Sequence, residues 1–253
     1  MNKNNFSKYN ILGLNLSDIT QKQLNDYIKF TIAKNEKIVI PNLNIHCVNL
    51  AHSEKWLQEF LNNHEVTFCD GDGVRIGAKI LGYHISEKIT YNRWIWDFAN
   101  ICQDENISWY LIGSKIEIIE IAVKKLKDKY PRLNILGYRD GYFKDQKDLE
   151  LTIRNINEKK PNILIIGMGM PLQEKFLYIN WTRIEANVAL TGGAVFDYIS
   201  GETKMTPNIF YKLKLEWFYR LVHEPKRLFK RYIVGNPVFF FRIIKNKIGL
   251  TKY

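Results

Sequence analysis

Short runs of aliphatic, β-branched or aromatic residues recur along this chain, and each is followed by a turn residue and then by a stretch with helical periodicity. The runs cover residues 38–40, 66–68, 109–112, 133–136, 163–166 and 188–190. One of the helical stretches, residues 116–130, carries apolar side chains on one face and ends before Pro131. This alternation predicts an α/β fold, Rossmann-like, with a largely parallel sheet flanked by helices.

Positive charge is concentrated near the C-terminus. The formal net charge is +11, and residues 204–253 hold 12 Lys or Arg against two acids, Glu216 and Glu224. We therefore expect an α/β core over residues 1–203 and a basic, aromatic helical appendage over residues 204–253, made of two or three short helices broken at Pro225 and at residues 235–237. Such an appendage should face an anionic partner, and charge alone does not choose among nucleic acid, phosphorylated ligands and acidic lipid.

Cysteine usage and hydropathy predict a cytoplasmic protein. Cys47, Cys69 and Cys102 are odd in number, far apart and without Cys-x-x-Cys spacing, which argues against a disulfide framework and a thiolate zinc site. The first ten residues lack the apolar stretch of a signal peptide, and no apolar run approaches the roughly 20 residues that span a bilayer. The five histidines show no ligand spacing, and neither a dinucleotide-binding fingerprint nor a Walker loop is present.

Asp70 is the first candidate for chemistry. It follows a predicted strand in the segment Cys69-Asp70-Gly71-Asp72-Gly73, and ligands of open parallel sheets bind at the carboxyl ends of the strands. A carboxylate in that position, with glycines beside it, can approach a ligand closely and act as a general base. An ordinary Asp-Gly turn is the structural alternative.

Two further segments follow predicted strands with polar side chains. Asn42 and Asn44 alternate after the first strand, so their amides can point to one side and bind sugar hydroxyls, although such a pair on its own is more often a cap or a turn. Residues 167–174 combine a glycine turn with Pro171, Gln173 and Glu174. Such a turn offers backbone N–H groups to a diphosphate. The same residues are also favourable at the N-terminus of a helix, whatever the ligand.

The basic appendage alternates cations with apolar residues. Arg220, Arg227, Lys230 and Arg231 lie among aromatic and aliphatic side chains, and residues 238–244 add an apolar stretch beside Arg242. An interfacial helix pair on an anionic membrane accounts for both segments. A core-packed helix with a solvated basic face is the alternative for residues 217–221.

Taken together, these segments resemble the WecG/TagA/CpsF family of bacterial glycosyltransferases over roughly residues 10–232. The resemblance is carried by Asn44, Asp70-Gly71, Gly82, Gly113, Tyr130-Pro131, Gly141-Tyr142-Phe143, Gly169, Pro171, Gln173-Glu174, Gly192-Gly193, Phe196-Asp197, Gly201, Pro207, Leu215-Glu216-Trp217, Arg220-Leu221, Glu224-Pro225 and Arg227. This ordered series is far more specific than any single motif in it.

The resemblance implies an inverting, metal-independent transfer from a UDP-sugar, typically UDP-N-acetylmannosamine, to N-acetylglucosamine on a polyprenyl diphosphate, for teichoic acid, enterobacterial common antigen or capsule. No cofactor beyond the donor is implied. Asp70 looks like the base that deprotonates the acceptor hydroxyl. The residues expected to bind substrate are Asn42, Asn44, Arg93, Gly113, Gly169, Gln173, Glu174, Arg220, Arg227 and Arg231.

Within that set, Gln173 and Glu174 would lie at the nucleotide-sugar pocket. Arg220 and Arg227, with Lys230 or Arg231 as a third cation, would close over the active site and neutralise the leaving diphosphate. The same region would dock on the inner face of the cell membrane. Asp70-Gly71-Asp72 also matches the Asp-x-Asp with which many glycosyltransferases hold a metal ion, which is the alternative to the metal-independent reaction.

Three departures from the family pattern bear on the donor. Asn42 stands where the family often has Thr, Tyr91-Asn92-Arg93 replaces Gly-x-Asp, and Met205-Thr206-Pro207 replaces Arg-Ala-Pro. Because Arg93 would suit an acidic or differently substituted hexose, UDP-glucose and UDP-glucuronate stay open as donors. A non-catalytic protein that binds nucleic acid or an anionic surface would explain the basic appendage, but it gives no reason for Asp70, Asn44 and Gln173. We expect no nucleic-acid partner, and the sequence leaves the oligomeric state open.

Overall fold

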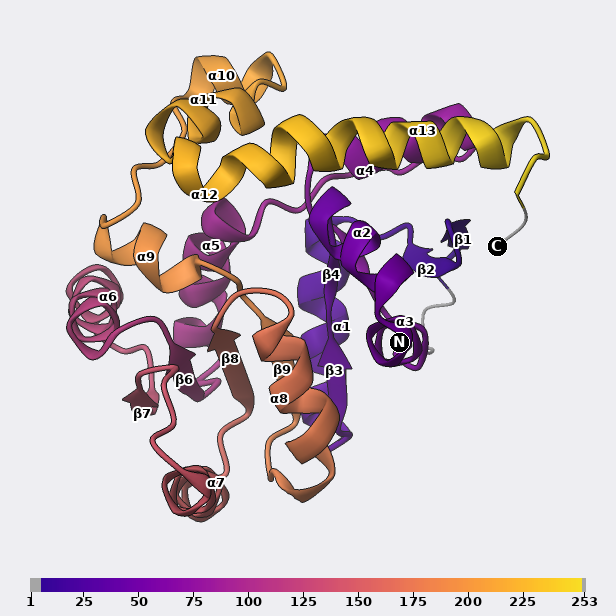
Figure 1. Ribbon diagram of the computed structural model, residues 1–253. Coiled ribbons are helices and arrows are strands. Elements are labelled where there is room, and N and C mark those ends of the chain that lie inside the picture. Colours follow the sequence, from indigo (N-terminus) through magenta and orange to yellow (C-terminus); the bar gives the residue numbers. More distant parts are fainter. Residues whose placement is uncertain (1–5, 252–253) are drawn as a thin grey trace. The chain divides into compact units, whose positions relative to one another are not determined.

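A five-stranded parallel sheet organises one part of the protein. The computed structural model describes residues 6–251 (Figure 1), and the sheet has the strand order β3-β9-β8-β6-β7 with every neighbouring pair parallel. Its strands are β3 (Ile38–Ile40), β6 (Trp109–Gly113), β7 (Ile135–Arg139), β8 (Ile163–Gly167) and β9 (Val188–Thr191). The predicted Rossmann-like α/β fold is confirmed.

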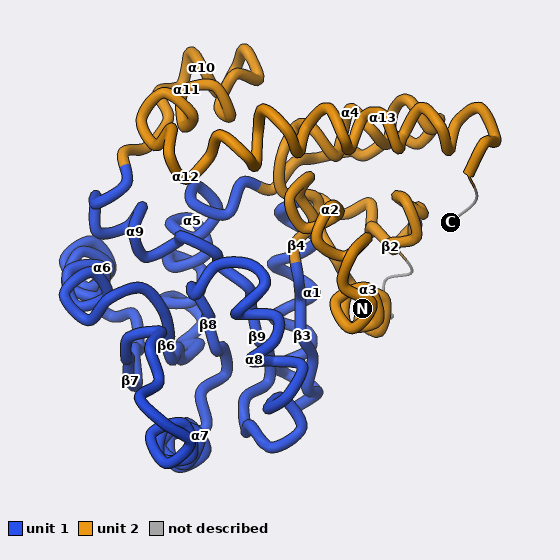
Figure 2. Tube along the Cα trace, viewed as in Figure 1, with its two compact units in different colours: residues 1–4, 21–41, 90–203 blue, residues 5–20, 42–89, 204–253 orange. Residues whose placement is uncertain are grey.

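The described chain divides into two compact units (Figure 2). Residues 21–41 and 90–203 form the first unit, and residues 6–20, 42–89 and 204–251 form the second. Thus the basic C-terminal segment belongs to the same unit as the segment that contains Asn44 and Asp70. The functional division that we expect at residue 203 stays a prediction.

The first unit surrounds its sheet with helices. They are α1 (Gln21–Ala33), α5 (Tyr91–Asp104), α6 (Ile116–Lys129), α7 (Gln146–Lys159), α8 (Leu172–Asn180), the 3₁₀ turn η1 (Trp181–Arg183) and α9 (Val195–Ser200). Every residue of β6, β8 and β9 is buried. Continuous burial along a strand means that both faces of the sheet are covered, which is why these strands read as unbroken apolar runs in the sequence.

The second unit begins with an antiparallel hairpin of β1 (Lys8–Ile11) and β2 (Leu14–Ser17). A separate two-stranded parallel sheet pairs β4 (Asn42–Leu43) with β5 (Phe68–Cys69). Three helices accompany them: α2 (Ile45–Ser53), α3 (Lys55–Asn62) and α4 (Asp72–Leu81). Of the run predicted at residues 66–68, only Phe68 lies in a strand, and that strand belongs to this small sheet and not to the main one.

The C-terminal segment is helical, as expected, but its second predicted break is wrong. It contains α10 (Asn208–Lys212), α11 (Glu216–His223), α12 (Pro225–Phe229), the π-helical turn η2 (Lys230–Val234) and α13 (Gly235–Lys247). Pro225 starts α12 as predicted. The chain runs through η2 directly into α13, because Gly235 keeps helical geometry (φ −67°, ψ −38°) and α13 continues through Pro237.

Helix α13 packs on the rest of the second unit. Phe239 and Ile243 are fully buried on the face that lies against α2 and α4. A Cβ on Gly77 would come within 2.7 Å of the Phe239 ring, so this glycine permits the close approach of α4 and α13. Among residues 6–251, no helix is long and apolar enough to cross a membrane.

Candidate active site

Asp70 and Asn44 lie at the same edge of a parallel strand pair. Asn44 directly follows β4 and Asp70 directly follows β5, and the backbone N–H of Asp70 donates to the carbonyl of Leu43 at 2.9 Å. Gly71, with φ +118°, then turns the chain into α4, a conformation that favours glycine. Two side chains predicted from separate motifs are therefore brought together at adjacent strand ends.

The surroundings of Asp70 raise the pKa of its carboxyl. Burial raises its pKa to about 6, and the nearby Glu216 carboxylate also raises it, while the charges of Arg220, Arg231 and Lys88 lower it. Asp70 as a residue is only partly buried by the surrounding chain. A carboxylate with a pKa near 6 is ionised at pH 7 and basic enough to accept a proton from a reacting hydroxyl.

Arg231 from η2 contacts Asn44 directly. Its Nη2 donates to Oδ1 of Asn44 at 3.4 Å, and the same oxygen accepts from the backbone N–H of Cys47 at 3.1 Å, so Asn44 also caps α2. Burial lowers the pKa of Arg231, and the nearby Arg220 and Arg227 charges lower it further, against the opposing effects of Tyr232 and Asp70. Its buried Nε has no hydrogen-bond partner within the described chain. Such a crowded guanidinium is suited to an anionic ligand.

The other predicted residues of the second unit are placed as follows. Asn42 is buried in β4, opposite Phe68 of β5. Arg220 lies in α11, and Arg227 lies in α12 with its Nε donating to Glu224 at 2.7 Å. Capping, the alternative considered for the Asn42–Asn44 segment, is confirmed at Asn44, and its substrate role stays a prediction.

Lys88 is part of this region, although nothing in the sequence pointed to it. Its Nζ lies 2.7 Å from Asp72, 3.8 Å from Glu216 and 3.9 Å from the centre of the Tyr211 ring. The Asp72 carboxylate of the Asp-x-Asp motif is therefore engaged by a lysine. Within the part of the chain that is described, no three His, Cys, Asp or Glu side chains are grouped so as to hold a metal ion.

In the first unit, glycines allow the strand ends to approach closely. A Cβ on Gly113, the last residue of β6, would lie 2.3 Å from the carbonyl oxygen of Gly167, the last residue of β8. Ser114 donates its N–H to that carbonyl at 3.1 Å and its hydroxyl to Asp197 at 3.1 Å. Gly169, with φ +76°, continues the turn after β8 in open surroundings. Binding of a diphosphate at this edge stays a prediction.

Gln173 and Glu174 form a buried polar pair beside that edge. Gln173 accepts from the N–H of Gly193 at 2.8 Å through Oε1 and donates to Glu174 at 2.8 Å through Nε2. Burial raises the pKa of Glu174 to about 7, and the hydrogen bond from Gln173 opposes that rise. The second carboxyl oxygen of Glu174 has no hydrogen-bond partner among residues 6–251. The pair thus ties the first turn of α8 to the glycine turn after β9.

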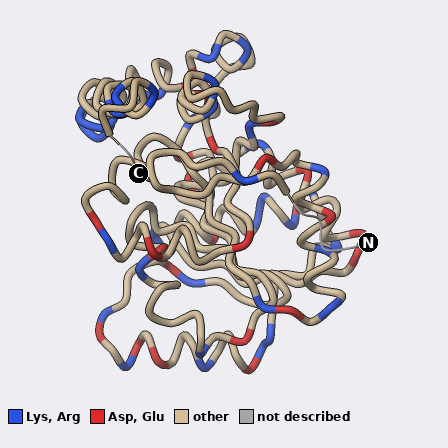
Figure 3. The backbone as a smooth tube through the Cα atoms, turned by 90° about the vertical axis from the view of Figure 1, so that its right-hand side faces the viewer, with Lys and Arg blue, Asp and Glu red and all other residues tan. Residues whose placement is uncertain are grey.

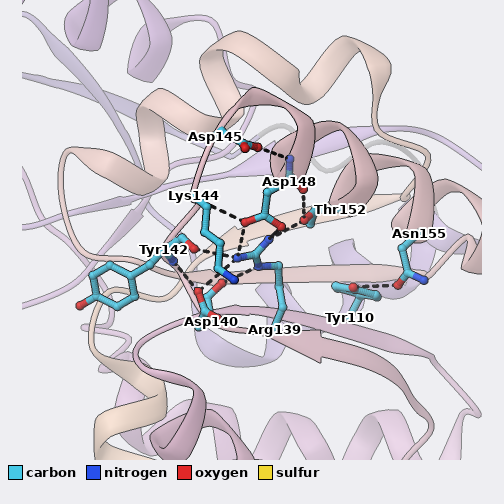
Figure 4. A network of polar contacts seen from close by, with 9 residues as sticks. All are labelled: Tyr110, Arg139, Asp140, Tyr142, Lys144, Asp145, Asp148, Thr152 and Asn155. Carbon is cyan, nitrogen blue, oxygen red and sulfur yellow. Dashed lines mark hydrogen bonds and ion pairs between the residues drawn. The ribbon is translucent and has the colours of Figure 1, made fainter.

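An arginine-centred network orders the loop after β7 (Figure 4). Arg139 donates to Asp148 at 3.0 Å, to Thr152 at 2.6 Å and to the carbonyl of Tyr142 at 2.8 Å, and its guanidinium lies over the Phe143 ring. Gly141 donates its N–H to the carbonyl of Ser114 at 2.9 Å. The family segment 141–143 is therefore fixed against the carboxyl end of β6, and Tyr142 is 66% exposed. Sequence reasoning did not find Arg139.

Arg93 lies in the first turn of α5, in the first unit, with a partly exposed side chain. Its backbone N–H donates to the carbonyl of Thr90 at 3.0 Å, an ordinary helix-start contact. Its role in donor recognition stays a prediction.

Comparison with known proteins agrees with this arrangement. The model of the "Glycosyl transferase WecG/TagA/CpsF family" matches residues 9–253. Relatives from Staphylococcus aureus strains MW2 and NCTC 8325 / PS 47 are both named N-acetylglucosaminyldiphosphoundecaprenol N-acetyl-beta-D-mannosaminyltransferase, and each is 27% identical over 252 residues, covering 99% of this chain and 97% of the relative. The chain therefore belongs to the WecG/TagA/CpsF family of glycosyltransferases.

Proposed function

We propose that this glycosyltransferase moves N-acetylmannosamine from UDP-N-acetylmannosamine to N-acetylglucosamine on a polyprenyl diphosphate, with inversion and without a metal ion. The relatives' name supplies the transferred sugar and the acceptor. The structural observation that carries the proposal is Asp70, a partly exposed residue at a strand end whose surroundings include Arg220 and Arg231.

The reaction needs a base and a site for the leaving group. Asp70 accepts the proton of the acceptor hydroxyl as that oxygen bonds to the anomeric carbon from the face opposite UDP, which inverts the configuration. The bond from the anomeric carbon to the diphosphate oxygen breaks, and UDP takes the electron pair. Arg220, Arg227 and Arg231 are the groups that we assign to the new negative charge, in place of a metal ion.

Arg93 bears on which UDP-sugar is the donor. UDP-glucose and UDP-glucuronate are the alternatives, since a cation in the first turn of α5 could favour an acidic sugar. The direct test is UDP release from a panel of UDP-sugars in the presence of a polyprenyl-diphosphate N-acetylglucosamine acceptor. Release that requires both UDP-N-acetylmannosamine and the acceptor supports the proposal, whereas preference for another donor would replace the sugar but keep the reaction.

We also propose that the second unit docks on the inner face of the cell membrane. Lys and Arg recur along its C-terminal helices (Figure 3), beside apolar side chains that face solvent. The exposed apolar residues of this segment are Ile209, Leu213, Leu215, Trp217, Phe218, Val222, Phe229, Ile233, Val234, Val238, Phe241, Ile244, Ile248 and Leu250. Exposed apolar surface next to cations suits an anionic bilayer, where the lipid-linked acceptor resides.

A further inference from the structure

Lys88 connects two segments that carry groups of the proposed site. Its neighbour Ile89 donates its backbone N–H to the carbonyl of Cys69 at 2.9 Å, which fixes this stretch beside the residue that precedes Asp70. The Lys88 side chain then reaches Asp72 at the start of α4, Glu216 at the start of α11 and the Tyr211 ring in α10. One side chain therefore ties the Asp70 loop to both α10 and α11.

The position of Glu216 makes this contact relevant to Arg220. Glu216 and Arg220 are four residues apart in α11, so they lie on the same face of the helix, one turn from each other. A contact that holds Glu216 near the Asp70 loop consequently holds Arg220 near it as well. The side chain of Lys88 is only 6% exposed, and those of Asp72 and Glu216 are 14% and 17% exposed, so water competes weakly for these charges.

We propose that Lys88 is a positioning residue for the transfer reaction: through Asp72, Glu216 and Tyr211 it holds α10 and α11 against the Asp70 loop and so places Arg220 beside the base. This inference rests on the proposed function. Lys88 contributes no atom to the chemistry, since its Nζ is occupied by its protein partners, and its effect on the reaction passes through Asp70 and Arg220.

The charges around Asp70 give this role a signature that loss of folding would not produce. Asp70 interacts with Glu216 and Arg220 from α11, Arg231 from η2, Lys88, and the thiol of Cys69, which stays protonated because burial raises its pKa. Lys88 lowers the pKa of Asp70 and Glu216 raises it. Removing the lysine should therefore raise the pKa of the base, and removing Glu216 as well should bring it back down.

The experiment compares the pH dependence of kcat/KM in the parent enzyme, Lys88→Met, Lys88→Arg and Lys88→Met/Glu216→Gln. Lys88→Met should lose about 10- to 100-fold in kcat, because a displacement of about 1 Å at a catalytic centre has that effect. The acidic limb of its pH profile, where kcat/KM rises with pH, should move to higher pH. The double variant should move the limb back toward lower pH. Lys88→Arg keeps a cation for both carboxylates and should stay close to the parent.

An unchanged kcat and acidic limb in Lys88→Met would overturn the inference. A lower kcat with an unmoved limb would overturn it too, because that is the result of a smaller folded fraction. If the parent releases no UDP with any donor, the proposed function fails separately, and the inference is then read from the carbon-13 NMR titration of the Asp70 carboxyl. An upward displacement of that titration in Lys88→Met supports it, and an identical titration refutes it.

Discussion

Arg231 donates from Nη2 to Oδ1 of Asn44 at 3.4 Å, joining residues that are 187 positions apart in the chain. The same oxygen caps α2 through the N–H of Cys47. Asn44 therefore stabilises a helix and contacts a cation of the proposed site with one atom. Its structural and functional contributions can be separated only by a substitution that preserves one of them.

Serine at position 44 is such a substitution. Its short hydroxyl is a good helix cap but does not extend as far toward Arg231, so Asn44→Ser should keep its stability within a few tenths of a kcal/mol and lose activity. Asn44→Ala should lose the cap as well, at about 1 kcal/mol. Urea unfolding and kcat for the two variants check this. Equal activity in Asn44→Ser and the parent would show that the Arg231 contact has no part in the reaction.

Asp70→Asn tests the base. The amide cannot accept the proton, so kcat should fall by about 10²–10⁴ while the fold is retained. In the parent, kcat/KM should rise as pH increases through about 6, because the ionised form of Asp70 is the active one. Asp128→Asn, at an exposed position of α6, is the matched control and should keep full activity. An Asp70→Asn enzyme that is fully active, or a parent profile without this acidic limb, would remove the assignment.

The strands were predictable from the sequence where burial requires an unbroken run of apolar residues. The strands at residues 38–40, 109–112, 163–166 and 188–190 are apolar throughout because both sheet faces are covered. The β1–β2 hairpin gave no such signal, because its turn places Leu12 at φ +53°, a conformation that usually calls for Asn or Gly. Helices were predicted on both sides of residues 235–237, but a break was expected there because a Gly-Asn-Pro sequence normally ends a helix.

The residues of the site were also predictable only in part from the sequence. Asp70 and Asn44 could be selected from the sequence because each follows a strand, and parallel strands end at a common edge. Lys88 and Arg139 could not be selected, since charged residues are common and their significance comes from partners brought together by the fold. What the sequence lacks is the pairing of distant residues, which neither spacing nor periodicity encodes.

Glu174 predicts a pH-dependent stability. In the unfolded chain it ionises near its ordinary pKa of 4.5, and in the folded protein near 7. Between these pH values the unfolded state has released a proton that the folded state retains, so ionisation favours unfolding and stability falls as pH rises, by up to about 3 kcal/mol. Glu174→Gln lacks the carboxyl but keeps an oxygen for Gln173.

The free energy of unfolding of Glu174→Gln, relative to that of the parent, should therefore be higher at pH 8 than at pH 5. Urea unfolding at both pH values measures it. Glu158→Gln, at an exposed position of α7, reports the effect of removing a surface carboxylate. A stability difference between Glu174→Gln and the parent that is the same at both pH values would show that Glu174 is ionised throughout.

Membrane docking predicts that two side chains of α13 contact lipid. Phe241 and Ile244 are 59% and 51% exposed, whereas Phe239 and Ile243 of the same helix are buried and hold it in place. The double substitution Phe241→Ser/Ile244→Ser should leave the packing of α13 intact and weaken binding to vesicles by at least about tenfold, because each apolar side chain contributes up to about 2 kcal/mol when it leaves water.

The matched control is Ile121→Ser/Leu151→Ser, which removes apolar side chains that are 45% and 52% exposed on α6 and α7. Sedimentation with vesicles of phosphatidylglycerol and phosphatidylcholine measures the difference, and binding of the parent should fall as salt is raised because the basic side chains of the segment are screened. Equal binding by the two double variants would exclude α13 from the docking surface. Binding of the parent to purely zwitterionic vesicles at the same strength would assign the attraction to apolar contact alone.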